Sequence, residues 1–259
     1  MIMKKLMVLL YGITNYNLGS ASLVCLIAFL FNFIPENPYL NSIDYGNPGN
    51  TATTIIVNLL LITLFGLQHS IMARPNFKKK LIKFIPEPAE RSTFMLVTAI
   101  AVFILCIFWQ PMTGIVWQVQ NANLYNAILI TGLLGWGMVF YATFIINHFD
   151  LFGLRQVWLY FKGQEYTHLP FTQSSLYKYI RHPIMSGVFI GIWLTPTMTT
   201  GHLLFALGMS VYIVIGVYHE EKDLVKIIGN RYLRYIDSTG KFFPKMNTDK
   251  KDLTYKQEL

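Results

Sequence analysis

Four long stretches of this chain contain no charged side chain. They cover residues 6–35, 51–73, 92–149 and 182–219, and apolar residues dominate each of them. A helix needs roughly 20 consecutive apolar residues to cross the hydrocarbon core of a bilayer. Each stretch has room for at least one crossing, and 92–149 has room for two with a turn between them. The pattern therefore predicts a polytopic helical membrane protein.

The composition supports the same class of protein. Hydrophobic residues make up 53% of the chain and charged residues only 13%, whereas soluble domains carry about 25% charged residues. The two cysteines, Cys25 and Cys106, each lie within an apolar stretch, where cysteine acts as a small packing residue. They indicate neither a disulfide framework nor a cysteine-based metal site.

Six crossings fit the uncharged stretches and predict an all-α transmembrane bundle. The expected ranges are 8–34, 52–73, 92–110, 124–147, 184–198 and 202–219. The fifth holds only about 15 residues, or about 22 Å of helix, which is less than a bilayer core. We therefore expect five to six spans, with the last two forming a helical hairpin packed against other helices.

Three features are expected next to the spans. The last helix should continue out of the membrane to Ile228, with Gly229 as its C-cap. Residues 150–163 mix aromatic and polar side chains, which is typical of a helix in the membrane interface. His202, at the start of the last span, should be interfacial. Residues 1–244 are expected to form one integral-membrane domain, followed by a polar tail at 245–259.

Basic residues are concentrated in segments expected on one side of the membrane. Residues 74–91 and 150–182 and the C-terminal region are rich in Lys and Arg, whereas 35–51 and 110–123 contain neither. The positive-inside rule places the basic segments and both termini in the cytoplasm. We expect a bacterial inner-membrane protein whose partner is the lipid bilayer. Its net charge of +8 is explained by topology, so no nucleic-acid partner is predicted.

Three ionisable residues at cytoplasmic ends of spans are candidate catalytic residues. His69 lies near the end of the second span, and His148 and Asp150 lie at the end of the fourth. Ionisable groups at membrane depth are costly to bury and are candidates for function. An aspartate close to a histidine can orient it as a base, although each residue could also be a hydrogen-bonded interfacial group. The three could hold a metal, but no metal is predicted.

A second cluster surrounds the start of the fifth span. Pro183 suits the first position of a helix, where free N–H groups attract an anion. Arg181, next to His182, could bind a carboxylate through two hydrogen bonds. Glu220 and Glu221 leave the membrane on the same side and could receive an ammonium group. The cluster fits a zwitterionic ligand, and the alternative is that these charges only anchor the helices.

The spacing of these residues resembles a known family. RHPxxxG at 181–187, EExxL at 220–224 and GxxYxxY at 229–235, followed by Pro244, resemble the C-terminal half of integral-membrane methyltransferases related to the isoprenylcysteine carboxyl methyltransferases. This resemblance implies S-adenosylmethionine as methyl donor, held on the cytoplasmic side by the hairpin. The donor-binding residues that it implies are His168, Leu169, Pro170, Phe171, Tyr177, Arg181, His182, Pro183, Ile184, Met185, Gly187, Glu220, Glu221, Tyr232 and Tyr235.

Two positions depart from the family pattern. Met185 stands where the family usually has Tyr, which weakens one donor contact. The prenylcysteine enzymes also have an Arg four residues before the acidic site, where this chain has Gly216 or Val217. The group that would hold a prenylcysteine carboxylate is therefore absent, which points away from that substrate.

The rest of the chain is similar to the bacterial methanethiol S-methyltransferases. The similar segments are 65–94, 146–163 and 194–213, and the resemblance spans about 60–244. It implies methylation of a small thiol, methanethiol, to give dimethyl sulfide and S-adenosylhomocysteine. Because a free thiol with a pKa well above 7 is mostly protonated at neutral pH, such an enzyme needs a base near the sulfur. The expected base is a histidine, His148 or His69, with Asp150.

Other functions fit parts of the pattern. A membrane methyltransferase with another thiol, a lipid or an isoprenoid as acceptor would share the donor site. An NADPH-dependent reductase of the sterol type has a similar Arg-His-Pro hairpin but needs more basic groups for the 2′-phosphate. A transporter would carry polar groups in broken helices at the membrane centre, whereas here they gather at the cytoplasmic ends.

Overall fold

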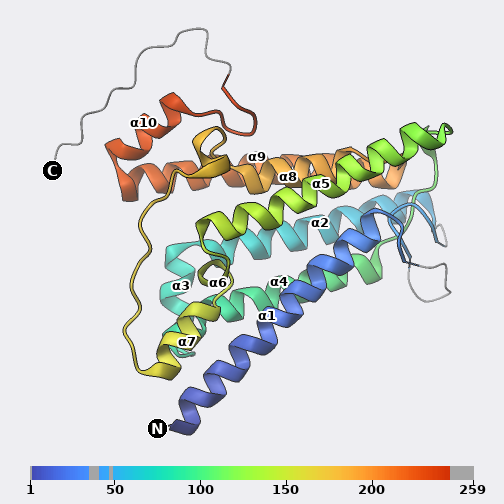
Figure 1. Ribbon diagram of the computed structural model, residues 1–259. Coiled ribbons are helices and arrows are strands. Elements are labelled where there is room, and N and C mark those ends of the chain that lie inside the picture. The colour runs from blue at the N-terminus through green and yellow to red at the C-terminus, as the bar shows by residue number, and fades with distance from the viewer. Residues whose placement is uncertain (1, 35–40, 47–48, 246–259) are drawn as a thin grey trace.

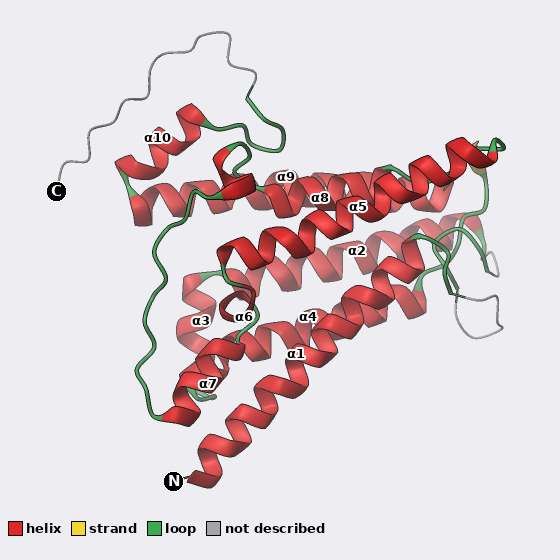
Figure 2. Ribbon diagram, in the orientation of Figure 1, coloured by secondary structure: helices red, strands yellow, loops and turns green. Residues whose placement is uncertain are grey.

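The structure, a computed structural model, describes residues 2–34, 41–46 and 49–245. Almost all of its regular structure is helical, as Figure 2 shows. Five long helices run along the molecule (Figure 1), and each is long and apolar enough to cross a membrane. They are α1 (Ile2–Leu30), α2 (Thr51–Ala73), α4 (Glu90–Phe108), α5 (Ala122–Ile146) and α9 (Thr200–Ile228). The prediction of a polytopic helical membrane protein is confirmed.

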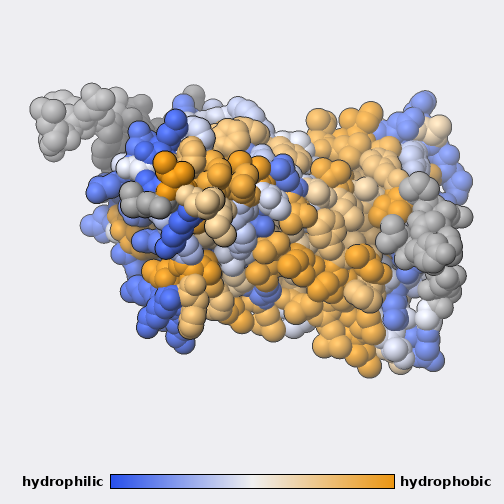
Figure 3. Space-filling view, turned by 90° about the horizontal axis from the view of Figure 1, so that it is seen from below, coloured by the Kyte–Doolittle hydropathy of each residue, from blue (hydrophilic) through white to orange (hydrophobic). Residues whose placement is uncertain are grey.

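The surface of the bundle explains why it requires a membrane. Figure 3 shows a broad hydrophobic band on one face, with hydrophilic residues gathered at its two ends. Large apolar side chains such as Val24, Leu60 and Ile100 are about half exposed or more on the outside of the long helices. Exposing apolar surface to water costs roughly 25 cal/mol per Å². The band is therefore the surface that contacts lipid.

One end of the bundle carries the short helices and the start of α1 (Figure 1). We call it the basic end, because the Lys- and Arg-rich segment 74–91 lies there. Its short elements are α3 (Pro75–Leu81), the 3-10 turns η1 (Glu87–Ala89) and η2 (Ser175–Lys178), α6 (His148–Leu151), α7 (Leu154–Lys162) and α10 (Asn230–Ser238). The interfacial helix expected within 150–163 is thus present as α7. Most of the polar tail expected at 245–259 lies outside the described residues.

The fifth span is shorter than predicted and continues as extended chain. Helix α8 (Pro183–Trp193) covers about 16 Å at 1.5 Å per residue. Strand β2 (Thr197–Thr199) then pairs antiparallel with β1 (Ile115–Gln118), with Ile115 opposite Thr199. Extended backbone advances about 3.3 Å per residue, so this segment reaches the far end of the bundle despite its short helix. The small sheet was not predicted, because so short a strand has no readable periodicity.

Glycines bring α8 into backbone contact with α5. A Cβ atom on Gly187 would lie 2.5 Å from the carbonyl oxygen of Gly135, and one on Gly135 would lie 2.7 Å from that of Gly187. One turn later, a Cβ on Gly191 would meet the indole ring of Trp136 at 2.4 Å. Small residues permit this close approach of membrane helices. Gly187, which the resemblance assigns to donor binding, therefore packs against α5.

The last long helix follows the sequence prediction at one end and departs from it at the other. It ends at Ile228 with Gly229 at φ 70° as its C-cap, as expected. The prediction that His202 is interfacial is wrong, because its side chain is fully buried. Its Nδ1 lies 3.4 Å from one carboxylate oxygen of Asp44, and the other oxygen of Asp44 accepts a 2.6 Å hydrogen bond from the Thr199 hydroxyl. The loop at 41–46 folds over the start of α9 and supplies this partner.

Candidate functional site

The candidate site begins where α5 ends. Asn147 has the left-handed backbone angles φ 89° and ψ 88°, and its side-chain oxygen accepts a 3.0 Å hydrogen bond from the backbone N–H of Asp150. Few residues other than glycine adopt this conformation, and asparagine is among those that tolerate it. Asn147 is thereby both the C-cap of α5 and the N-cap of α6. Strained positions of this kind cluster at functional sites.

The turn places His148 in a box of aromatic rings. The imidazole stacks on Phe144 with ring centres 4.2 Å apart, and it meets the edges of Phe149 and Phe152 at 5.4 and 4.6 Å. Only 6% of His148 is exposed. Burial lowers the pKa of His148 from its usual value, because a charged imidazole is poorly solvated among aromatic rings. The residue is therefore neutral at pH 7.

Hydrogen bonds define which nitrogen of His148 carries the proton. The hydroxyl of Thr143 donates to the Phe140 carbonyl at 2.7 Å, so its oxygen accepts from Nδ1 of His148 at 2.8 Å. Nε2 must then be the acceptor of the neutral ring. It lies 2.9 Å from the hydroxyl of Tyr16 on α1. The phenol of Tyr16 therefore donates to Nε2.

Asp150 has partners other than His148. Its carboxylate forms an ion pair with Arg155 at 2.9 Å and accepts a 3.2 Å hydrogen bond from Tyr166. Arg155 also donates to the carbonyl and hydroxyl oxygens of Thr167 at 2.8 and 2.6 Å. Asp150 therefore fixes the start of the segment that leads from α7 to α8. His148 is oriented not by Asp150 but by the hydroxyls of Thr143 and Tyr16.

His69 lies in a different environment from His148. Its ring packs against Phe65 of α2 and Phe94 of α4 with centres 5.5 and 4.8 Å apart, and Nδ1 is 3.5 Å from the hydroxyl of Thr98. It thus contributes to the contact between α2 and α4. Among the described residues, no group of three or more His, Cys, Asp or Glu side chains could hold a metal ion. His69, His148 and Asp150 are therefore not gathered into a metal site.

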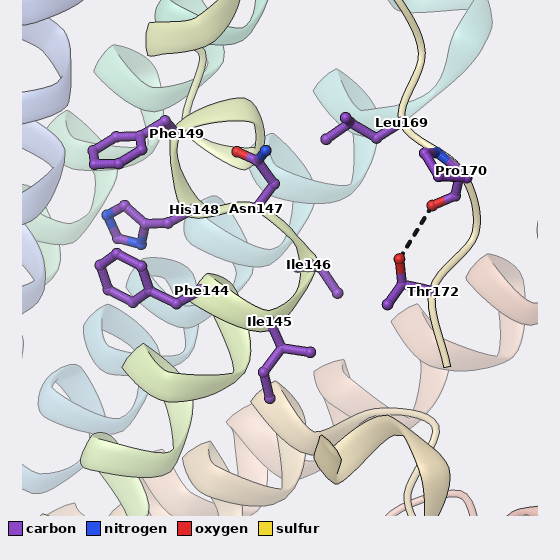
Figure 4. Close-up of a pocket in the computed structure, with 9 residues that line it drawn as sticks. All are labelled: Phe144, Ile145, Ile146, Asn147, His148, Phe149, Leu169, Pro170 and Thr172. Atoms are coloured by element: carbon purple, nitrogen blue, oxygen red, sulfur yellow. Dashed lines mark hydrogen bonds between the residues drawn. The ribbon is translucent and has the colours of Figure 1, made fainter. Parts of the chain in front are cut away.

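A pocket of about 430 Å³ opens beside the turn (Figure 4). One wall is the end of α5 and the turn, residues 144–149, and the other is Leu169, Pro170 and Thr172. In Figure 4 these three lie across the pocket from the turn, while the ring of His148 lies between Phe144 and Phe149. A candidate base and two residues implied for donor binding thus line one pocket.

The segment at 164–174 forms the outer wall of this pocket and is held at both ends. Tyr166 and Thr167 bind Asp150 and Arg155, as described above. At the other end, the ring of Phe171 lies 5.8 Å from Tyr232 and 5.3 Å from Tyr235 of α10. The stretch between these anchors, which includes His168, passes over the pocket.

A network of ion pairs joins α8, α9 and α10 next to this wall. Glu221 binds Arg181 at 2.8 Å and His182 at 3.2 Å through one oxygen, and Lys241 at 2.8 Å through the other. Arg181 also donates to the carbonyl oxygens of Ile236, at 3.0 Å, and Thr239. We call Arg181, His182, Glu221 and Lys241 the rim network. Burial lowers the pKa of His182, against the opposing influence of Glu221.

Glu220 lies beside the rim network and is accessible to solvent. The side chain of Glu220 is 53% exposed, and its carboxylate lies 3.7 Å from Nδ1 of His182. Close by, the hydroxyl of Tyr235 donates a 2.6 Å hydrogen bond to the Tyr177 carbonyl, and burial raises the pKa of Tyr235 to about 12. Tyr235 therefore remains a protonated donor that ties α10 to η2.

The structure places all residues implied for donor binding at the basic end. They lie in the segment at 164–174, in η2, at the start of α8, at the end of α9 and in α10. Sequence reasoning missed several residues that complete the site. They are Tyr16, Thr143, Arg155, Tyr166 and Lys241, of which only Arg155 carried a local signal, as a cation in the interfacial helix five residues after Asp150.

The helical bundle, with its lipid-facing band and a cluster of ionisable groups at the basic end, defines an integral-membrane protein with a candidate site at one end of its long helices. Residues 57–241 match the family model described as NnrU protein, and the chain belongs to this family. Helix α1, and Tyr16 with it, lies before the matched range.

Curated relatives resemble nearly the whole chain. It is 38% identical over 240 residues to methanethiol S-methyltransferase 1 of Bradyrhizobium diazoefficiens, covering 93% of this chain and 83% of that protein. It is 37% identical over 244 residues to the methanethiol S-methyltransferase of Mycobacterium tuberculosis, covering 93% and 98%. The nurim of Danio rerio is a more distant relative, 25% identical over 81% of this chain and 74% of its own. The resemblance inferred from the sequence is confirmed. No solved structure matches significantly.

Proposed function

We propose that this protein transfers a methyl group from S-adenosylmethionine to methanethiol, giving dimethyl sulfide and S-adenosylhomocysteine. Relatives that cover most of the chain at 37–41% identity bear the name of this activity. The structural observation that carries the proposal is the pocket lined by both His148 and the segment at 169–172. In this proposal the turn that carries the base lies next to the wall expected to bind the donor.

The residues around the rim network fit a zwitterionic sulfonium donor. Glu220 is exposed and can receive the ammonium group. The first N–H groups of α8, at Ile184 and Met185, have no carbonyl one turn before them and can bind the carboxylate. The ring of Phe171, over which the Arg231 guanidinium lies at 5.4 Å, would contribute apolar surface for the adenine. When bound, the donor supplies a methyl group on a positively charged sulfur.

In this proposal Arg181 and Glu221 act as the frame of the donor site. Their ion pair joins the start of α8 to the end of α9, which are the two elements that supply the ligand contacts. Buried ion pairs hold such geometry only when every partner is satisfied, and here His182 and Lys241 complete the carboxylate's contacts. The ligand would therefore meet a preorganised site.

We assign the base to His148. It is neutral and shielded by aromatic rings, which exclude water from the thiolate that it generates. His69 packs between α2 and α4 and has a structural role in this account. We infer that the basic end faces the cytoplasm, because the lysines of α3 flank the spans there, and that the membrane is the bacterial inner membrane.

Headspace analysis of dimethyl sulfide tests the proposed function. Membranes containing the protein, given methanethiol and S-adenosylmethionine, should release dimethyl sulfide, whereas membranes without it should not. S-Adenosylhomocysteine should stabilise the purified protein against heat, and NADPH should have no effect. Methylation of a lipid or another thiol without dimethyl sulfide would overturn the acceptor assignment. Stabilisation by NADPH alone would favour the reductase.

A further inference from the structure

A second cavity of about 410 Å³ also adjoins the turn at 147–149. Its walls come from α1 and α7, and Asn147 and Phe149 line both this cavity and the first pocket. The other lining residues are Leu9, Ile13, Leu154, Arg155 and Trp158. Most of them are apolar, and Arg155 is already paired with Asp150. The cavity thus suits a ligand with little need for polar partners.

Tyr16 is connected to this second cavity through two of the residues that line it, Ile13 and Phe149. It follows Ile13 by three residues on α1, so the two side chains share a face of the helix. Its ring lies 6.4 Å from Phe149, which lines both cavities, and 6.3 Å from Phe152. Its hydroxyl donates to Nε2 of His148, and as a phenol oxygen it can still accept one hydrogen bond.

We propose that the apolar cavity between α1 and α7 receives the thiol and that Tyr16 passes the thiol's proton to His148. The inference rests on the proposed function and deepens it, because it names the acceptor's binding space and a second catalytic residue. Neither nitrogen of His148 is free, since Thr143 and Tyr16 occupy both. The Tyr16 oxygen ends this chain of hydrogen bonds and can still accept a proton from a ligand.

The proton that the thiol loses is taken up within this chain of groups. The thiol S–H bond breaks as its proton joins the Tyr16 oxygen, and the phenol's original proton moves to Nε2. A thiolate and an imidazolium result. The thiolate sulfur then bonds to the methyl carbon of the sulfonium donor as the bond from that carbon to the donor sulfur breaks. The imidazolium finally returns its proton to water through Tyr16.

One aromatic contact offsets part of the cost of charging the buried His148 ring. Phe144 stacks on the ring with planes 3° apart, and aromatic faces attract cations. The ionisable groups around His148 are Tyr16 of α1, Asp150 of α6, Arg155 of α7 and Arg91 of α4, whose guanidinium lies 3.5 Å from the Leu151 carbonyl oxygen. The Asp150 and Arg155 charges offset each other, and burial remains the main influence on the pKa of His148.

A pair of tyrosine substitutions on α1 tests the proton path. Tyr16→Phe keeps the ring and removes the hydroxyl, and we expect the turnover number to fall about 100-fold with donor affinity unchanged. Loss of the hydrogen bond that favours neutral His148 should also move the acid limb of the rate profile to higher pH. Tyr11→Phe is the matched control, because the Tyr11 hydroxyl binds Thr93 at 2.9 Å. It should behave as wild type.

Filling the second cavity tests the binding space. Ile13→Phe should raise KM for methanethiol at least tenfold and leave donor affinity unchanged. Because the cavity is larger than a one-carbon thiol, wild type should also methylate ethanethiol, and Ile13→Phe should reduce that activity further. Donor binding, measured by calorimetry, shows that each variant is folded.

The outcomes separate this inference from the proposed function. Wild type that makes no dimethyl sulfide would overturn the proposed function itself. Active wild type with equal rates and pH profiles for Tyr16→Phe and Tyr11→Phe would overturn the proton path alone. An unchanged KM in folded Ile13→Phe would overturn the assignment of the cavity to the thiol.

Discussion

His148 combines burial with two hydroxyl partners, and this combination determines how it responds to pH. Burial lowers its pKa below the usual value of about 6.5, so the neutral base persists at pH values where an exposed histidine is half charged. The rate of methyl transfer should therefore fall on the acid side with a midpoint below that of an ordinary histidine. A rate profile measured with saturating donor checks this. An acid limb with its midpoint above pH 6.5 would contradict it.

Arg181 is the residue whose loss should cost the most stability at the basic end. Arg181→Met removes the ion pair to Glu221 and frees two carbonyl groups at the end of α10. Breaking a buried ion pair costs about 3–5 kcal/mol, so the midpoint of thermal unfolding in detergent should fall clearly. Arg234→Met, at an exposed position of α10, is the control and should leave the midpoint unchanged. Equal unfolding midpoints for the two variants would show that the contacts of Arg181 do not stabilise the fold.

At the scale of elements, the contact between α5 and α8 sets where the hairpin lies. Gly135→Ala would place a Cβ 2.7 Å from the Gly187 carbonyl oxygen, and overpacking of this kind costs about 1–3 kcal/mol. We expect a lower unfolding midpoint. Gly137→Ala, on the same helix, meets no atom within 4 Å among the described residues, so it should be neutral or slightly stabilising. A midpoint for Gly135→Ala at or above that of Gly137→Ala would exclude a tight α5–α8 contact.

The elements also show which parts of the fold could be predicted from the sequence. The long helices could be predicted because membrane thickness imposes a length and an absence of charge that local sequence displays. The end of α9 could be predicted because Gly229 is a local C-cap signal. The β1–β2 sheet and the burial of His202 could not, because each depends on partners distant in sequence, at Ile115 and Asp44.

Contacts between residues that are distant in sequence also limited what could be predicted of the site. The segment at 168–171 and the RHP motif carry family patterns, so the donor wall could be predicted from sequence. The orientation of His148 could not, because Tyr16 lies 132 residues away along the chain on a helix before the matched family range. The prediction that Asp150 orients His148 followed from nearness in sequence, whereas in the structure Asp150 binds Arg155.

At the scale of the whole molecule, the account predicts that the candidate site faces the cytoplasm. Single cysteines introduced by Lys79→Cys in α3 and Gln120→Cys after β1 lie at opposite ends of the bundle (Figure 1). In a chain with Cys25 and Cys106 replaced by Ala, a membrane-impermeant thiol reagent applied to intact cells should label position 120 and not position 79. The reverse labelling would invert the topology and place the basic end outside.

The most direct test of the central claim compares dimethyl sulfide formation by His148→Gln and His69→Gln at saturating, verified donor occupancy. Because a positioned general base contributes about 100- to 10,000-fold, His148→Gln should lose at least 100-fold in rate. His69→Gln should stay within a few fold of wild type. A His148→Gln protein that binds the donor and forms dimethyl sulfide at the wild-type rate would contradict the account.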